Sequence, residues 1–205
     1  IMGTVLKTEA ITMRFGGVTA VNELKLNIEE HKIVALIGPN GAGKTTAFNM
    51  ITGVYTPTEG KVKYTCPGKD EVDITGKRPS DIAKMGIART FQNIRLFAAL
   101  TALENVMIGQ HLRTKAGLWG AMVRNKATRE EEARTQARAL ELLEYVGIAH
   151  VANEVASSLS YGDQRRLEIA RALATGPSLL ALDEPAAGMN PQETEDLMRM
   201  IRFVR

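Results

Sequence analysis

The chain has 205 residues, 44% of them hydrophobic, and a formal charge of +3 at pH 7. This length suits one α/β domain, or a core with a small subdomain, and the modest charge gives no reason to expect nucleic-acid binding. No apolar run approaches the length of a membrane span, and the start lacks the apolar stretch of a secretory signal. The single cysteine, Cys66, fits a reducing compartment. We therefore expect a cytoplasmic domain that reaches a membrane only through a partner.

The first half of the chain predicts strands around a glycine-rich loop. Residues 1–35 alternate polar and apolar side chains, which predicts antiparallel strands, and Gly16-Gly17 indicates a turn between them. The continuous apolar run 32–37 predicts a strand buried on both faces. A helix is expected from about Lys44 to Ile51, and a short strand at 61–64.

Residues from about 95 to 150 read as helical. The pairs Thr101 with Glu104 and Thr128 with Glu131 have the spacing of capping boxes, so we expect helices to begin there. The stretch 111–128 looks like an insertion, which either faces a lipid or protein partner or folds back on its own subdomain.

The last part of the chain predicts a helix, a strand and a second helix. The first helix is expected at about 163–174, and an apolar strand follows at 179–182. The final helix should begin with Asn190 as its cap and Pro191 at its first position.

One motif binds phosphate. The sequence from Gly38 to Thr45 matches G-x-x-x-x-G-K-[ST], between an expected strand and an expected helix. Glycines let backbone N–H groups turn towards phosphate oxygens, Lys44 should reach the β- and γ-phosphates, and the Thr45 hydroxyl should bind Mg²⁺. The alternative is a chance glycine-rich turn. The candidate ATP-binding residues are Gly38, Pro39, Asn40, Gly41, Ala42, Gly43, Lys44, Thr45 and Thr46.

Two carboxylates follow the apolar strand at 179–182. That position suits Asp183 as a carboxylate that organises Mg²⁺, and Glu184 as the general base that polarises the attacking water. The alternative is that both residues simply start a surface turn. Beside a phosphate loop, the pair favours hydrolysis of ATP.

A second phosphate-recognising surface is expected at the start of the 163–174 helix. Ser160 and Gly162 would offer a hydroxyl and a backbone N–H at a helix N-terminus, unless Ser160 is only a helix cap. The phosphate loop already serves this chain's own nucleotide. The second surface is therefore useful if it binds a nucleotide held by another copy.

The motif Leu159-Ser160-Tyr161-Gly162-Asp163, followed by Asp183-Glu184, resembles the ATPase subunits of ABC transporters. The resemblance implies two ATPase subunits paired head to tail, with Ser160, Tyr161 and Gly162 closing on the partner's ATP. Here Tyr161 and Asp163 replace the commoner glycine and glutamine, while Ser160 and Gly162 are kept.

The resemblance also assigns roles to isolated residues. Gln92 would bind Mg²⁺, take part in catalysis and sense the membrane partner, although a lone glutamine is more often just solvated. Phe15 would stack on adenine, and the alternative is a place in the core. Asn190 would partly replace a customary aspartate of the dimer interface.

The resemblance implies a P-loop NTPase α/β fold with a parallel sheet, an N-terminal antiparallel β subdomain and an inserted helical subdomain. We expect a single domain over 1–205, with a β and phosphate-loop core (1–94), a helical subdomain (95–158), the signature helix (159–175) and a further core segment (176–205). The family's switch histidine should follow Glu184, but His31, His111 and His150 all precede Ser160. We therefore expect that the natural chain is longer, that the C-terminal part of the core is missing, and that hydrolysis by the 205-residue chain is impaired.

Over nearly its whole length the sequence is similar to ATPases of prokaryotic branched-chain amino acid importers. This similarity implies a subunit that uses ATP and Mg²⁺ to power an integral membrane permease from the inner face of the plasma membrane. ATPases of urea or amide importers and of lipopolysaccharide exporters remain alternatives. So do a soluble, non-transport ABC ATPase and a module that no longer hydrolyses ATP.

Overall fold

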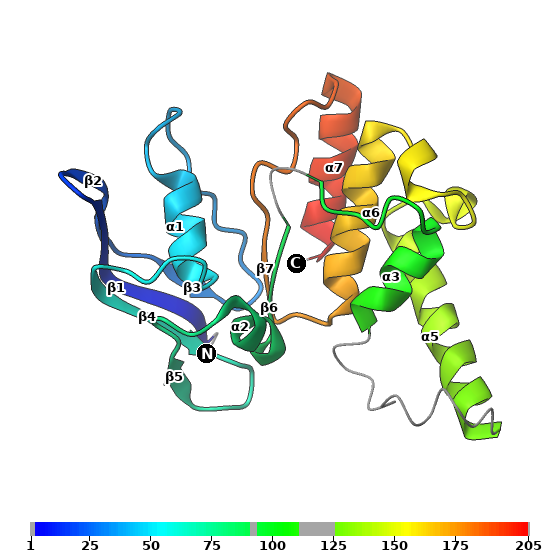
Figure 1. The fold of residues 1–205 in the computed structure, drawn as a ribbon, viewed down its shortest axis with the longest axis horizontal. Coiled ribbons are helices and arrows are strands. Elements are labelled where there is room, and N and C mark those ends of the chain that lie inside the picture. The colour runs from blue at the N-terminus through cyan, green and yellow to red at the C-terminus, as the bar shows by residue number, and fades with distance from the viewer. Residues whose placement is uncertain (1–2, 91–93, 111–125, 205) are drawn as a thin grey trace. The chain divides into compact units, whose positions relative to one another are not determined.

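The structure is a computed structural model that describes residues 3–90, 94–110 and 126–204, with side chains from residue 130 to 202 in the last range. Two compact units make up the chain: Ile1–Arg89 together with Ile201–Arg205, and Thr90–Met200. Figure 1 draws both as ribbons. Gln92 lies outside the described residues, as does 111–125, which is most of the expected insertion.

The first unit is built on an antiparallel sheet, as the alternating pattern predicted. Its order is β2-β1-β4-β5, with β3 also paired to β1. The strands are β1 (Thr4–Phe15), β2 (Val18–Leu24), β3 (Asn27–Glu29), β4 (Glu59–Thr65) and β5 (Glu71–Asp73). Gly16 and Gly17 form the turn between β1 and β2, which confirms the expected hairpin.

The core of the first unit lies on β1 and β4. Leu6 and Ile11 from β1, with Val62 and Tyr64 from β4, are at most 1% exposed. Burying each of these side chains contributes about 2 kcal/mol. A few large buried side chains therefore stabilise the sheet, and the alternation of polar and apolar residues in the sequence identifies them.

The expected strand at 32–37 is wrong. These residues have no regular secondary structure, and the side chains of Ile33, Val34 and Ile37 are 53%, 46% and 90% exposed. An apolar run favours a strand, but a strand is stable only when a neighbour pairs with its N–H and C=O groups. The part of the chain that the structure describes gives this segment no such neighbour.

Helix α1 (Lys44–Ile51) has the predicted bounds. Gly53 ends it in a left-handed turn with φ of 75°, where a Cβ would lie 2.4 Å from the Lys77 carbonyl oxygen. Helix α2 (Pro79–Met85) and strand β6 (Ile87–Arg89) complete the unit. The tight turn at Gly53 fixes the direction in which the chain leaves α1.

The second unit is mainly helical. Its helices are α3 (Ala102–Gln110), α5 (Lys126–Tyr145), α6 (Tyr161–Ala174) and α7 (Pro191–Val204), of which residues 191–200 belong to this unit. The unit also has short 3₁₀ turns η1 (Ala149–Val151) and η2 (Ala156–Ser158) and strand β7 (Leu179–Ala181). Helices α3 and α6 approach closely at Gly109, where a Cβ would lie 2.5 Å from the Arg171 carbonyl oxygen. None of the described helices is both long and apolar enough to cross a membrane.

The two capping-box predictions had different outcomes. Thr101 and Glu104 form the expected box: the Thr101 N–H donates to Glu104 Oε2 at 2.8 Å, and the Glu104 N–H donates to Thr101 Oγ1 at 3.2 Å. A helix start at Thr128 is wrong, because α5 is already helical at Lys126. A Thr-x-x-Glu spacing also fits within a helix, so the motif alone does not fix the first turn.

The Thr101 box predicts a pH dependence. Hydrogen bonds from the Thr101 backbone and hydroxyl hold the pKa of Glu104 below its usual value. A lowered pKa in the folded state means that the ionised carboxylate stabilises the fold above about pH 4.3, and that this stabilisation is lost as the pH falls through the lowered pKa. We expect Glu104→Ala to melt at a slightly lower temperature than the wild type at pH 7. That difference should vanish in acid, and a difference that persisted there would contradict the assignment.

Candidate functional site

The phosphate loop forms an exposed turn in front of α1. The residues from Pro39 to Ala42 are exposed, and the Ala42 N–H donates to the Pro39 carbonyl at 3.2 Å. Lys44, Thr45 and Thr46 form the first turn of α1, where the N–H groups lack partners within the helix. Free N–H groups at the start of a helix suit an anion such as phosphate.

Two glycines of this loop have backbone conformations that other residues seldom adopt. Gly41 and Gly43 both have φ of 83°. A Cβ on Gly43 would lie 2.3 Å from the Ala20 carbonyl oxygen and 2.9 Å from Val21 Cγ2, both in β2. The end of the loop therefore rests directly on β2. A Cβ on Gly41 would meet nothing within 4 Å.

Lys44 extends back over the loop. Its ammonium donates to the Gly38 carbonyl at 2.7 Å and to the Pro39 carbonyl at 2.9 Å. An ammonium group held over the start of the loop is suited to oxygens of a polyphosphate. The residues present thus fit the phosphate part of a nucleotide.

Asp183 and Glu184 follow β7 in the second unit. Asp183 is 3% exposed, so its carboxylate is placed in the interior near the end of the strand. Glu184 has φ of 47°, and its carbonyl accepts a hydrogen bond from the Ala187 N–H at 3.1 Å. A glutamate in the left-handed region is strained, and such strain collects at functional residues. The backbone therefore turns sharply at Glu184 and no longer follows the direction of β7.

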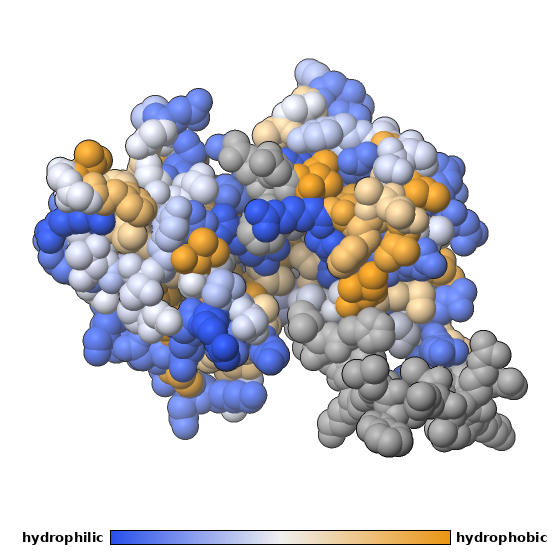
Figure 2. Space-filling view, viewed as in Figure 1, coloured by the Kyte–Doolittle hydropathy of each residue, from blue (hydrophilic) through white to orange (hydrophobic). Residues whose placement is uncertain are grey.

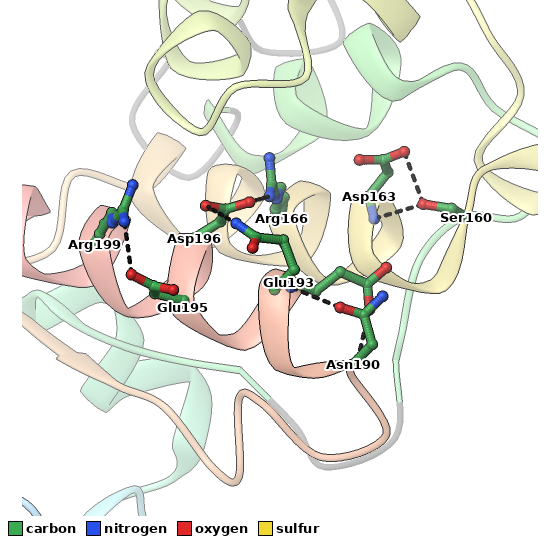
Figure 3. Close-up of polar contacts among 9 residues, drawn as sticks. Ser160, Asp163, Arg166, Asn190, Glu193, Glu195, Asp196 and Arg199 are labelled. Carbon is green, nitrogen blue, oxygen red and sulfur yellow. Dashed lines mark hydrogen bonds and ion pairs between the residues drawn. The ribbon is translucent and has the colours of Figure 1, made fainter.

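Ser160 caps α6. Its hydroxyl oxygen accepts from the Asp163 N–H at 3.1 Å and its proton is donated to Asp163 Oδ2 at 2.8 Å (Figure 3). The capping interpretation of Ser160 is therefore correct for this helix. It does not conflict with phosphate binding, because a hydroxyl can change its acceptor.

Gly162 and the start of α7 lie against each other. A Cβ on Gly162 would lie 3.0 Å from Glu193 Oε1. The Glu193 N–H donates to Asn190 Oδ1 and the Asn190 N–H donates to Glu193 Oε2, both at 2.9 Å (Figure 3). Asn190 is thus the predicted cap of α7. Arg166 of α6 and Asp196 of α7 add an ion pair at 3.8 Å.

A buried charge pair that the sequence does not indicate lies behind Tyr161. Arg165 and Glu168 of α6 are each 2% exposed and form an ion pair at 3.1 Å. Arg165 also donates to the Tyr161 hydroxyl at 3.2 Å and stacks over its ring, which is 44% exposed. Removing one partner of a buried pair costs about 3–5 kcal/mol. The sequence signal is a one-turn spacing of opposite charges, which exposed helices also show.

Gly188 lets the turn after Glu184 reach the Tyr161 ring. Gly188 has φ of 79°, and a Cβ there would lie 3.3 Å from the nearest atom of that ring. Tyr161, the residue that departs from the commoner glycine, therefore packs against the segment that follows the two carboxylates.

Phe15 ends β1 and is 45% exposed. Its ring contacts that of Tyr55 edge to face, with centroids 5.5 Å apart. Phe15 and the phosphate loop belong to the first unit, whereas Ser160, Asp183 and Glu184 belong to the second.

The family model described as "ABC transporter" matches residues 21–187, which include the phosphate loop, Ser160 and Glu184. The chain belongs to the ABC transporter family. As a member, it is an ATP-binding cassette, the kind of subunit that hydrolyses ATP.

Sequence relatives with ABC transporter functions match nearly the whole chain. The high-affinity branched-chain amino acid transport ATP-binding protein LivG of Escherichia coli K12 is 46% identical over 98% of this chain and 76% of its own length. The corresponding protein BraF of Pseudomonas aeruginosa is 45% identical over 98% of this chain and 77% of its own.

Solved structures of ABC cassettes share the fold. The ADP conformation of an ATP-binding cassette of an ABC transporter has a TM-score of 0.81 and 32% identity, and the match covers 98% of this chain and 77% of that one. A dimeric cassette in a post-hydrolysis state with ADP and Pi has a TM-score of 0.74 and 29% identity, over 96% and 81% of the two chains. The expected α/β cassette fold is thereby confirmed.

Proposed function

We propose that this cassette powers a membrane permease that imports branched-chain amino acids. The phosphate loop, with Gly43 seated on β2 and Lys44 across its mouth, is the observation that carries the nucleotide-binding part. The proposal for the solute rests on the similarity to LivG and BraF, since no residue of the cassette is expected to contact the solute.

Each residue of the ATP site has a distinct task in this proposal. Lys44 exchanges its two backbone carbonyls for β- and γ-phosphate oxygens. The Thr45 hydroxyl and the Asp183 carboxylate are hard oxygen ligands of the kind that hold Mg²⁺ alongside phosphates and water. Bound there, Mg²⁺ would neutralise charge on the phosphates. Gln92, named by resemblance, would join them, and Phe15 would stack on adenine.

Glu184 acts as the general base in this proposal. A carboxylate that accepts a proton from water makes the water a better nucleophile towards the γ-phosphate. The left-handed backbone conformation of Glu184 supports this role, because strained conformations collect at functional residues. Proton acceptance by Glu184 and charge neutralisation around Asp183 are thus assigned to adjacent residues.

Ser160 and Tyr161 are exposed at the start of α6, whereas Gly162 is buried, and the two exposed residues support the proposed head-to-tail pairing with a second cassette. Ser160, Tyr161 and Gly162 would contact the partner's nucleotide, once the Ser160 hydroxyl turns from Asp163 to a phosphate oxygen. Within a single chain this surface duplicates the phosphate loop. It gains a purpose only in a pair.

An exposed apolar surface on the second unit supports permease binding. Phe97 is 49% and Val155 40% exposed, and the two segments are joined by a hydrogen bond from the Ala156 N–H to the Leu100 carbonyl at 2.8 Å. Figure 2 shows hydrophobic side chains gathered on one face of this unit. Through such a contact the cassette would lie at the inner face of the plasma membrane.

An uptake assay tests the identity of the transported solute. In the organism that carries this chain, deletion of its gene should strongly reduce uptake of labelled leucine, and expression of the wild type should restore it. Urea uptake and lipopolysaccharide export should be unchanged. Normal leucine uptake with loss of either of the other activities would replace our proposal with the matching alternative.

A further inference from the structure

Two exposed aromatic rings meet at the end of the β1–β2 hairpin. Phe15 is 45% and Tyr55 37% exposed, and their planes are inclined by 76° in an edge-to-face contact. Val18, the strand partner of Phe15, is 66% exposed beside them. Figure 2 shows apolar side chains at this hairpin. Rings that served only the core would be buried, so this cluster suits a flat apolar ligand.

The backbone holds Tyr55 firmly between α1 and β1. The Tyr55 N–H donates to the Asn49 carbonyl of α1 at 3.0 Å. On the other side, the Thr58 N–H donates to the Thr12 carbonyl at 2.8 Å, and the Arg14 N–H donates to Thr58 Oγ1 at 3.1 Å. The segment from 55 to 58 is therefore attached to both α1 and β1, so the backbone that carries the Tyr55 ring is held in place.

Phe15 and the phosphate loop both lie beside strand β2. Gly43 rests on Ala20 of β2, and the Phe15 partner Val18 is two residues along that strand. At the usual rise of a strand this separation is about 7 Å. This end of the hairpin is therefore within reach of the base of a nucleotide whose phosphates lie at α1.

We propose that Tyr55 is a positioning residue for the nucleobase. The edge-to-face contact between the two rings holds Phe15 in place to stack on the adenine of ATP. This inference rests on the proposed ATP site and adds a residue to it. If Tyr55 only joined the loop to the hairpin, its loss would weaken the binding of all ligands alike. If its ring positions the nucleobase, its loss weakens the binding only of ligands that carry a base.

The test measures the affinities of ATP and of inorganic tripolyphosphate for the phosphate loop. Both ligands are titrated into the protein calorimetrically in the presence of Mg²⁺. We expect Tyr55→Ala to weaken ATP binding roughly 5- to 10-fold and to leave tripolyphosphate binding unchanged. Tyr55→Phe keeps the ring and should bind ATP within about twofold of the wild type. Tyr145→Ala, which removes a tyrosine of 47% exposure from α5, is the matched control and should change neither affinity.

A double variant tests whether Tyr55 acts through Phe15. Phe15→Ala with Tyr55→Ala should bind ATP no more weakly than Phe15→Ala alone. Equal weakening of ATP and tripolyphosphate by Tyr55→Ala, or independent effects of the two substitutions, would overturn the positioning role. If the wild type bound neither ligand, the proposed ATP site itself would fail, and the role of Tyr55 with it.

Discussion

Glu184→Gln should abolish most ATP hydrolysis while leaving ATP binding intact. Glutamine has the shape of glutamate but cannot accept the proton of the attacking water, and a general base contributes roughly 100- to 10,000-fold to a rate. The phosphate loop is unchanged in this variant, so its affinity for ATP should match that of the wild type. Phosphate release and ATP titration measure the two properties separately.

The same variant should accumulate the ATP-bound pair. If hydrolysis is what separates two cassettes joined by their nucleotides, blocking it should move the protein from monomer to dimer when ATP and Mg²⁺ are added. Sedimentation velocity with and without ATP would detect this shift. Both effects follow from a single lost proton acceptor.

Glu195→Gln is the matched control. Glu195 lies on α7 and is paired with Arg199 at 2.6 Å, with 59% of its side chain exposed (Figure 3). This variant makes the same chemical change at an exposed position in the helix, and we expect wild-type hydrolysis. Retained hydrolysis in Glu184→Gln, or equal losses in both variants, would remove Glu184 from the role of base.

Local motifs were predictable because each depends on a few neighbouring residues. The bounds of α1 follow from the loop that ends at Gly43 and the turn at Gly53. The caps at Thr101 and Asn190 follow from an acceptor placed three residues before a glutamate. In each case the atoms that interact are close in sequence, so their spacing carries the information.

Features that depend on distant neighbours were not predictable. The run 32–37 has the composition of a buried strand, yet its conformation depends on strands elsewhere in the chain. Likewise, one-turn spacing of Arg165 and Glu168 cannot show that both are buried. Phe15 and Tyr55 are in contact although they are 40 positions apart, and no local sequence pattern predicts this contact.

Gly43→Ala should severely weaken ATP binding. Alanine in the left-handed region costs about 1–2 kcal/mol, and its Cβ would also lie 2.3 Å from the Ala20 carbonyl oxygen. A backbone carbonyl within a sheet cannot move aside easily, so the loop must shift and its N–H groups must leave their positions around the phosphates. We expect ATP affinity to fall by at least about tenfold, which is the effect of 1.4 kcal/mol.

Substitutions at two other glycines distinguish the steric clash of the new Cβ with β2 from the strain of a positive φ. Gly68 lies between β4 and β5 with φ of 76°, Gly41 lies in the phosphate loop with φ of 83°, and a Cβ on either would meet nothing within 4 Å. Gly68→Ala should lower the melting temperature without changing ATP affinity. Gly41→Ala should weaken ATP binding less than Gly43→Ala, because its Cβ meets no protein atom. If all three variants bound ATP equally well, the contact of Gly43 with β2 would not be what shapes the phosphate site.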